Sequence, residues 1–563
     1  MRPARIGAAV VVALALTACA GIPTEGPVQQ GPVNAPAGDD RVVRVLANPP
    51  RDGMTPAEVV RGFQEATASP DVTYDIAKLY LTREARASWD PSSGVMIYDS
   101  TTLTLTPTPT ASAVDAAGRM AGTIGSSGEY SVAAPGTKLA TSYGVAKVDG
   151  QWRISAPPDG LVLSATDIER GYRSYNLYFF TRDFTTLVPD PVTVPLTGSG
   201  LPTLLVRTLV AGATPWIAPA LRTALPEGTK LSVDSVPVID GVAQIDLTPE
   251  VLKADDTTRQ KLSAQLVWTL RQLPDISAVQ ITVNGRPLPV PGVGSVQPIT
   301  SWPLADPDAL SSLALGHAVD RRGLLTIGKD NEISSVRIKP DLVLPGVSLD
   351  SSRVAGLSPD RRTVYEARLI DGSTGVRRYS GRALSRPSWD ASGAFWVVDR
   401  GVGLVMVKDG KATTMPVAEM PSGLKDADLI SAAVSRDGTR MALLVGRGTR
   451  VEPLVARIER VGDQVRVASP RRVESTLTEA VDLAWSDADT LAVLGTSGAS
   501  SLEVLLLDVG SSRLRRVGVP EDAVTLAAAP SRPVLIGAGT TIFRSTGSTW
   551  SKVTDGQYPV YPG

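Results

Sequence analysis

A short motif that recurs through the second half of the chain constrains its fold more than any other feature. Each copy is a tight turn between two apolar, strand-like segments. Three copies are of the Ser-x-Asp type, a fourth reads Trp485-Ser486-Asp487, and the first and last copies are degenerate. The copies are centred on Asp320, Asp360, Asp390, Asp437, Asp487 and Ser531, at steps of 40, 30, 47, 50 and 44 residues. A propeller blade of four antiparallel strands needs about 40–50 residues. The spacing therefore predicts a β-propeller of six blades over residues 308–563, in which the aspartates accept backbone N–H groups and fix the turns.

The N-terminus has the pattern of a bacterial lipoprotein leader. Arg2 and Arg5 give it a positive start, residues 6–16 are apolar, and Leu16-Thr17-Ala18-Cys19 matches the lipobox. The apolar stretch is shorter than the roughly 20 residues that a permanent membrane helix needs. We predict a signal peptide over residues 1–18 and a mature chain that begins at Cys19, whose thiol carries diacylglycerol and whose amine can carry another acyl chain such as palmitate. Two or more acyl chains give stable anchoring.

The alternative is a plain secretory peptide with an incidental cysteine. Cys19 is the single cysteine of the chain and stands where the lipobox requires it, which favours lipidation. Residues 19–47 are rich in Pro and Gly and predict a flexible tether between lipid and folded domains. Later apolar runs are interrupted within about ten positions, so no further membrane span is predicted. We expect the protein on the extracytoplasmic face of the cell membrane, held by its lipid.

Residues 48–160 predict a first α+β domain. Thr55 and Glu58 form a capping box at a helix start, and Val59, Phe63 and Ala66 then fall on one helical face. A second helix is expected over residues 74–89, followed by alternating strands. This order resembles the nuclear transport factor 2-like superfamily.

Residues 165–295 predict a second α+β domain. Two alternating segments, 233–239 and 242–247, flank Asp240-Gly241, which is a favoured two-residue hairpin turn. Asp255 or Asp256 can cap the next helix. That helix is expected to bury an apolar stripe in the domain core, made of Leu262, Leu266, Leu270 and Leu273. With "NLYFF", "DGVAQIDLT" and "VQITVNGRPLP" in this order, the segment resembles the GerMN domain of spore-germination lipoproteins.

The order of lipobox, GerMN-like segment and degenerate propeller, whose turns resemble those of TolB-type propellers, is similar to the LpqB family of actinobacterial lipoproteins. The resemblance spans nearly the whole chain. It implies a partner, the extracytoplasmic part of the sensor histidine kinase MtrB of the MtrAB two-component system. It also implies a role in modulating signalling that governs cell-wall homeostasis and division.

Composition limits the function classes that remain. The 56 basic and 57 acidic residues give a formal net charge of -1, which argues against nucleic acid as a partner. One Cys and one His exclude an internal disulfide and a zinc site of the Cys/His type. We predict no cofactor and no bound metal.

Candidate catalytic and ligand-binding residues all have a structural interpretation that we favour. His317, the only His, would have to serve any Ser-His-Asp triad, but it stands at the expected entry to the propeller. Asp255 and Asp256 lack the spacing of a calcium loop. The stretch Gly122–Gly128 lacks the ending of a P-loop and is expected to be a solvent loop.

Three tryptophans, Trp389, Trp396 and Trp485, could offer platforms for stacking on sugar rings. Two of them precede the repeated turn, which favours packing inside the blades.

The sequence therefore predicts an interaction protein without enzymatic activity, whose domains bind the outer region of a membrane sensor. Two other classes stay open. One is a binding module for peptidoglycan or another envelope glycan, with the central pocket of the propeller as its site. The other is a glycan hydrolase that uses a pair of carboxylates, which spacing alone does not exclude.

Overall fold

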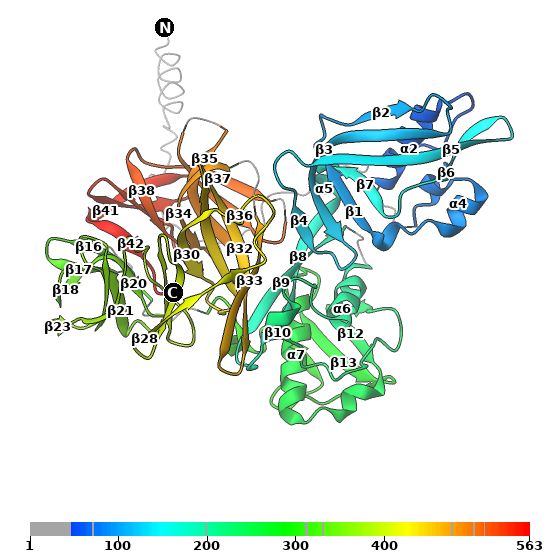
Figure 1. Cartoon of the computed structure of the whole chain (residues 1–563). Helices are drawn as coiled ribbons and strands as arrows, with labels where there is room; N and C mark the ends of the chain where they lie inside the picture. The colour runs from blue at the N-terminus through cyan, green and yellow to red at the C-terminus, as the bar shows by residue number, and fades with distance from the viewer. Residues whose placement is uncertain are drawn as a thin grey trace, which may run out of the picture. The chain divides into compact units, whose positions relative to one another are not determined.

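The computed structural model describes residues 47–69, 73–196, 200–309, 314–328, 332–473, 477–498, 501–511 and 513–563 (Figure 1). The predicted signal peptide, Cys19 and nearly all of the predicted tether lie outside the described residues. Within these described ranges, no helix is both long and apolar enough to cross a membrane.

The N-terminal domain packs short helices against an antiparallel sheet. Its helices are α2 (Pro56–Thr67), α3 (Asp75–Lys78) and α4 (Arg83–Ser88). The main strand path runs β6 (Gln151–Ala156), β5 (Lys138–Val148), β3 (Ala113–Gly125), β1 (Gly94–Tyr98) and β7 (Leu161–Ser164), and β2 (Thr104–Pro107) and β4 (Tyr130–Val132) both pair with β3. Among the described strand pairs of this domain, β1–β7 is parallel and the others are antiparallel. The likeness to nuclear transport factor 2 stays a prediction.

The predicted start of α2 is confirmed. The Thr55 hydroxyl accepts the Glu58 N–H, and the Glu58 carboxylate accepts the Thr55 N–H at 2.7 Å. Val59, Phe63 and Ala66 are buried on the face that meets the sheet.

The single helix expected over residues 74–89 is wrong, because the chain forms α3 and α4 instead. Leu81 bridges to Ile154 of β6, and the Thr82 N–H donates to the Ile154 carbonyl at 2.8 Å. These backbone groups cannot also serve a continuous helix. Thr82 instead caps α4, since its hydroxyl accepts the Ala85 N–H.

The second domain follows directly after α5 (Ala165–Gly171). A long hairpin, β8 (Tyr172–Thr181) and β9 (Leu187–Pro195), precedes α6 (Leu201–Ala211). The parallel strands β12 (Val242–Leu247) and β13 (Ala278–Val283) are then joined through α7 (Asp256–Leu270). The domain is the GerMN-like fold that the sequence predicted. The Asp255 carboxylate caps α7 by accepting the Thr258 N–H at 2.7 Å, and the predicted leucine stripe is buried.

The hairpin expected around Asp240-Gly241 is shorter than predicted. Both turn residues have positive φ, 51° and 78°, as a tight hairpin turn requires. On its first arm, however, only β11 (Val238–Ile239) pairs with β12.

The C-terminal region is the predicted β-propeller, built from six four-stranded antiparallel blades among the described residues. The first blade is β18 (Ile333–Val336), β17 (Gly323–Ile327), β16 (Gly316–Asp320) and β42 (Gln557–Val560). The second is β20 (Val343–Val347), β21 (Arg353–Leu357), β22 (Thr363–Arg368) and β24 (Val376–Ser380), and the third is β25 (Ser388–Trp389), β26 (Phe395–Asp399), β27 (Gly403–Lys408) and β28 (Lys411–Met415). The fourth is β30 (Asp428–Val434), β31 (Arg440–Arg447), β32 (Arg450–Val461) and β33 (Gln464–Arg472), and the fifth is β34 (Leu477–Trp485), β35 (Thr490–Ser497), β36 (Glu503–Asp508) and β37 (Leu514–Gly518). The sixth is β38 (Ala523–Ala527), β39 (Leu535–Ala538), β40 (Thr541–Thr546) and β41 (Thr549–Asp555). The last strand of the chain, β42, thus completes the first blade.

The predicted role of the repeated aspartates is confirmed. In each of the five aspartate turns predicted from the repeat, the carboxylate accepts the N–H of the residue two positions later, at 2.7–3.2 Å. The sixth copy has Ser531, which adopts a positive φ of 54° in its turn.

The alignment of the repeat was wrong at one step. Asp320 and Asp360 lie in turns between the second and third strands of their blades, whereas Asp390 lies between the first and second strands of its blade. The true equivalent of Asp390 in the second blade is Asp350, which accepts the Ser352 N–H at 3.1 Å. Measured from Asp350, the steps are 40, 47, 50 and 44 residues, so the short step of 30 came from joining two different turns.

The packing interpretation of the three tryptophans is confirmed, because Trp389, Trp396 and Trp485 are all buried. The Trp389 indole N–H donates to the Gly346 carbonyl at 2.9 Å, and that of Trp485 to the Ala433 carbonyl at 3.0 Å. Both acceptors lie on the innermost strand of the preceding blade. These tryptophans therefore join neighbouring blades.

A partly buried arginine of the propeller contacts both other domains. The Arg471 guanidinium on β33 forms an ion pair with Glu129 of the N-terminal domain at 2.7 Å. It also lies over the indole ring of Trp216 in the GerMN-like domain, 3.8 Å from the ring centroid. The Trp216 N–H donates to the Ser469 carbonyl of β33 at 2.8 Å. We call Arg471, Glu129 and Trp216 the three-domain junction.

Replacing Arg471 by Met should destabilise the protein by about 3 kcal/mol, because it leaves the largely desolvated Glu129 carboxylate without its ion-pair partner. Urea unfolding of the detergent-solubilised chain measures this. Arg466→Met is the matched control: Arg466 is half-exposed on the same strand, and its loss should leave the unfolding midpoint almost unchanged. Equal midpoints for the two variants would show that the three-domain junction contributes little.

A group of partly buried carboxyls lies where the GerMN-like domain and the propeller meet. Asp308 accepts the Ala488 N–H at 2.7 Å, and Asn176 of β8 donates to Asp489. Burial and the neighbouring Asp489 raise the pKa of Asp308 to about 7, and the same two causes raise the pKa of Asp487. These acids bind protons more tightly in the folded than in the unfolded chain. Their contribution to stability is therefore present at low pH and lost as the pH rises from about 4 to about 7.

Asp308→Asn should remove part of this pH dependence. The amide is nearly isosteric and can still accept the Ala488 N–H, but it carries no charge at pH 8. We expect a clearly higher melting temperature than wild type at pH 8 and little difference at pH 4, measured by differential scanning calorimetry in matched salt. A constant difference at both pH values would contradict the assignment of the effect to ionisation.

Candidate functional site

The centre of the propeller holds a cavity of about 600 Å³, which we call the funnel. Every blade contributes at least one residue to the lining of the funnel. Each of these residues lies on the innermost strand of its blade or directly before that strand: Leu344, Arg386, Ser431, Asp482, Thr525 and Tyr558. A volume of this size is typical of small-molecule sites. Because the six blades contribute together, the funnel exists only in the closed ring.

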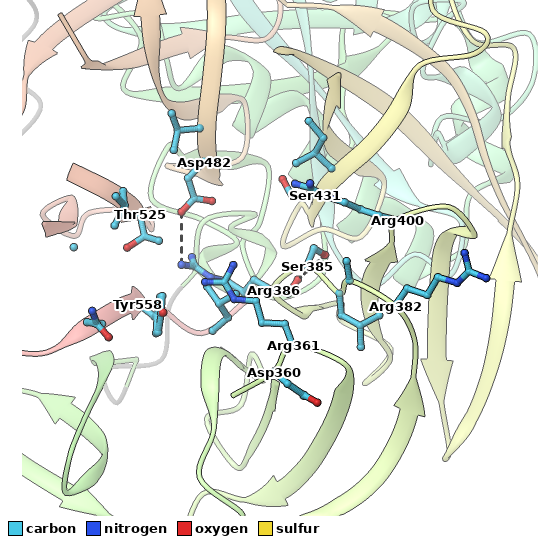
Figure 2. A pocket seen from close by; sticks show the side chains of 18 of the residues that line it. Asp360, Arg361, Arg382, Ser385, Arg386, Arg400, Ser431, Asp482, Thr525 and Tyr558 are labelled. Carbon is cyan, nitrogen blue, oxygen red and sulfur yellow. Dashed lines mark hydrogen bonds and ion pairs between the residues drawn. The ribbon is translucent and has the colours of Figure 1, made fainter. Parts of the chain in front are cut away.

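Arg386 and Asp482 both line the funnel. With Ser431 they also line a second cavity of about 70 Å³, whose lining includes residues 560–563 at the C-terminus. The Arg386 Nη2 atom lies 3.6 Å from the Asp482 carboxylate, an ion pair drawn as a dashed line in Figure 2. Burial raises the pKa of Asp482, and the neighbouring positive charge of Arg386 opposes that rise.

Asp482 and Arg386 are both held by the backbone of the sixth blade. The Asp482 carboxylate accepts the Leu526 N–H at 2.9 Å, and Arg386 Nη1 donates to the Leu526 carbonyl at 3.1 Å. The pair is therefore fixed on β38 as well as on its own strands.

Several polar atoms in the funnel have no hydrogen-bond partner among the described residues. They are Nε and Nη2 of Arg386, the Ser431 hydroxyl and the Thr525 hydroxyl. Thr525 is only 8% exposed, so open solvent does not readily satisfy its hydroxyl. Buried polar groups in proteins are normally hydrogen-bonded, and unpaired ones often mark sites for a ligand or water.

The mouth of the funnel carries three further arginines, Arg361, Arg382 and Arg400, all of them exposed. In Figure 2 the side chains of Arg361 and Arg386 converge near Thr525, whereas Arg382 extends away from them. Asp360 is occupied in its own turn, where it accepts the Ser358 hydroxyl and the Arg362 N–H. The mouth is therefore basic.

The residues singled out from the sequence lie elsewhere. Cys19 is outside the described residues. His317 is buried in β16, with its Nδ1 3.2 Å from the Thr326 hydroxyl, and burial lowers its pKa to about 4. The structural interpretation of His317 is confirmed, as is the capping role of Asp255.

The solvent loop expected at Gly122–Gly128 is wrong in part. Residues 122–125 belong to β3, where Gly122 pairs with Ile97 on one side and Val132 on the other. Only residues 126–128 form the turn into β4.

Sequence reasoning missed the funnel, although the repeat contains a signal for it. Residues four to six positions before the first turn of a blade face the channel. Arg386 precedes Asp390 by four positions, Asp482 precedes Asp487 by five, and Ser431 precedes Asp437 by six. No single motif distinguishes these positions.

Among the described residues, no group of three or more His, Cys, Asp or Glu side chains could hold a metal ion.

Comparison with known proteins matches three parts of the chain to family models. Residues 49–169 match the N-terminal domain of Lipoprotein LpqB, residues 176–289 match a domain described as sporulation and spore germination, and residues 336–562 match the Lipoprotein LpqB beta-propeller domain.

Relatives of similar length match over nearly the whole chain. Lipoprotein LpqB of Thermobifida fusca is 30% identical and covers 99% of each chain. That of Streptomyces coelicolor is 29% identical over 100% of this chain and 98% of its own, and that of Mycobacterium tuberculosis is 26% identical over 97% of each.

Solved structures with local likeness include TolB from Acinetobacter baumannii, with 14% identity and a TM-score of 0.35 over 52% of this chain and 84% of TolB. The first GerMN domain of GerM from Bacillus subtilis has 25% identity and a TM-score of 0.18, over 23% of this chain and 94% of that domain.

Fold and site together define a multi-domain protein in which two α+β domains, the second of them GerMN-like, precede a β-propeller with a basic central funnel. The chain belongs to the Lipoprotein LpqB family. It is accordingly an accessory lipoprotein of the extracytoplasmic type.

Proposed function

We propose that this protein is anchored through Cys19 to the outer face of the cell membrane and binds the extracytoplasmic domain of an MtrB-like sensor histidine kinase. Binding modulates two-component signalling in cell-wall homeostasis and division. The observation that carries the proposal is the full-length match to the Lipoprotein LpqB family, together with the kinase partner that the family resemblance implies. The protein acts by binding, without catalysis.

The geometry of the three-domain junction supports this role. Arg471 contacts Glu129 and Trp216, and the Arg457 guanidinium donates to the Trp216 carbonyl at 3.0 Å. These contacts link the domains, so a partner can meet surfaces of more than one domain at once. Anchoring in the same membrane as the kinase raises the effective concentration, and a modest affinity then suffices.

A second candidate function is binding of peptidoglycan or another envelope glycan in the funnel. Unpaired donors at Arg386, Ser431 and Thr525 favour a polar ligand there. A glycan hydrolase that uses two carboxylates is the weaker third candidate.

Crosslinking in intact membranes of the host, followed by affinity purification and mass spectrometry, tests the kinase proposal. A sensor kinase should be recovered with the full-length lipoprotein and lost when the outer domain of the kinase is deleted. Recovery of wall material without a kinase would transfer support to glycan binding. Release of soluble sugars from purified cell wall would contradict the non-enzymatic role.

Cys19→Ser should abolish the lipid anchor, because a serine hydroxyl does not replace the thiol that receives diacylglycerol. We expect no incorporation of labelled palmitate and at least about a tenfold drop in kinase crosslinking, from the lost effective concentration. Thr17→Ser, a conservative change two positions earlier, is the matched control and should keep both. Unchanged palmitate labelling of the Cys19→Ser variant would place the lipid on another residue and refute the anchor.

A further inference from the structure

We propose that the funnel is a binding site for a carboxylate ligand, the free C-terminal carboxylate of a short peptide, and that Arg386 receives it. The site goes beyond the kinase interaction and does not depend on it. It is argued from the unpaired edge of one guanidinium, the charge of the lining and the unpaired hydroxyls beside it.

One edge of the Arg386 guanidinium makes no hydrogen bond to a described residue. Nη1 is committed to the Leu526 carbonyl, but Nε and Nη2 make no hydrogen bond among the described residues. The Asp482 carboxylate lies 3.6 Å from Nη2, which is beyond hydrogen-bonding distance. Nε and Nη2 lie on the side of the guanidinium that binds a carboxylate through two parallel N–H···O bonds. The side chain lines the funnel and is 17% exposed as a whole, but Nε and Nη2 are themselves buried. This edge is therefore desolvated, and binding requires a shift of the side chain that opens the edge to the funnel.

The charge of the lining favours an anion. Four arginines and two aspartates line the funnel, which leaves a positive excess. Of the two aspartates, Asp360 is exposed and bonded within its own turn, while Asp482 is bonded to the Leu526 N–H. Concave basic sites raise the local concentration of anions and speed their entry.

The remaining lining favours an organic carboxylate over an inorganic anion. The hydroxyls of Ser431 and Thr525 are unpaired and can donate to carbonyl oxygens of a peptide or accept its N–H groups. Apolar side chains complete the wall: Leu344, Leu384, Ile430, Val481 and Val524. A short peptide with small side chains matches this combination of a charged end, amide groups and apolar contacts.

The competing explanation is that Arg386 and Asp482 only join the third, fifth and sixth blades. The two explanations predict opposite effects for Asp482→Asn. If the pair is only structural, this variant weakens the ring and changes no affinity. If Arg386 receives a carboxylate, removing the like charge of Asp482 strengthens binding by about threefold, because a negative charge no longer faces the ligand.

The test is isothermal titration calorimetry, in which the full-length chain in detergent is titrated with N-acetyl-Ala-Ala. Two further ligands are titrated in parallel: the same dipeptide with an amidated C-terminus, and inorganic phosphate. We expect the acid to bind at least about tenfold more tightly than the amide, because the amide loses the charge-assisted pair of hydrogen bonds. Phosphate should bind more weakly than the acid, since it makes no apolar contacts.

Variants locate the site. Arg386→Gln should weaken binding of the acid at least about tenfold, and Arg466→Gln, on the outer part of β33, should leave it unchanged. Asp482→Asn keeps the test decisive even if Arg386→Gln does not fold. Equal affinity for acid and amide, tighter binding of phosphate than of the acid, or no gain in Asp482→Asn would each overturn the proposal. Kinase crosslinking is scored separately, so failure of either hypothesis leaves the other standing.

Discussion

Antiparallel pairing between β42 and β16 joins the end of the chain to the first blade, and the propeller depends on this closure. Val560 pairs with His317 and Gln557 with Val319, so β42 covers the inner edge of β16. Tyr561, directly after β42, packs into the core between the first and sixth blades and donates its hydroxyl to the Pro533 carbonyl at 2.8 Å. Tyr558 of the same strand lines the funnel. The strand that closes the ring therefore also completes the candidate binding site.

Partly buried charge is used in two different ways in this molecule. In the three-domain junction, Arg471 and Glu129 form an ion pair across a domain boundary. The main effect of such a pair is to raise the free energy of any domain arrangement that separates the two charges. In the funnel, Arg386 is only partly satisfied by Asp482, at 3.6 Å. A desolvated guanidinium with unpaired N–H groups lowers the stability of the fold unless a ligand accepts hydrogen bonds from those groups. This is the physical basis for assigning a ligand to Arg386.

The sequence predicted local structure well where one residue dominates the local backbone. Thr55 and Glu58 start α2, Asp255 starts α7, and the repeated aspartates fix turns, because each effect needs only neighbouring N–H groups. It failed where a distant strand competes for the same groups. Ile154 takes the backbone N–H of Thr82 and breaks the helix expected over residues 74–89. The misaligned step of the repeat also reflects information that is not local. Asp350 and Asp360 make the same kind of turn, and only the order of the strands shows that Asp350 follows the first strand of its blade and Asp360 the second.

The sequence by itself determined the order of domains, the propeller class and the lipobox at Cys19, because periodicity, turn chemistry and a short contiguous motif are all local properties of the chain. It also supplied the family, whose members match from end to end. Only the tertiary structure decided that Arg386, Ser431, Asp482 and Thr525 face one funnel, and that Arg471 meets Glu129 and Trp216. In the sequence these residues are separated by about forty to several hundred positions. They come together in space because ring closure and domain packing bring them there, and no local pattern in the sequence encodes those long-range contacts.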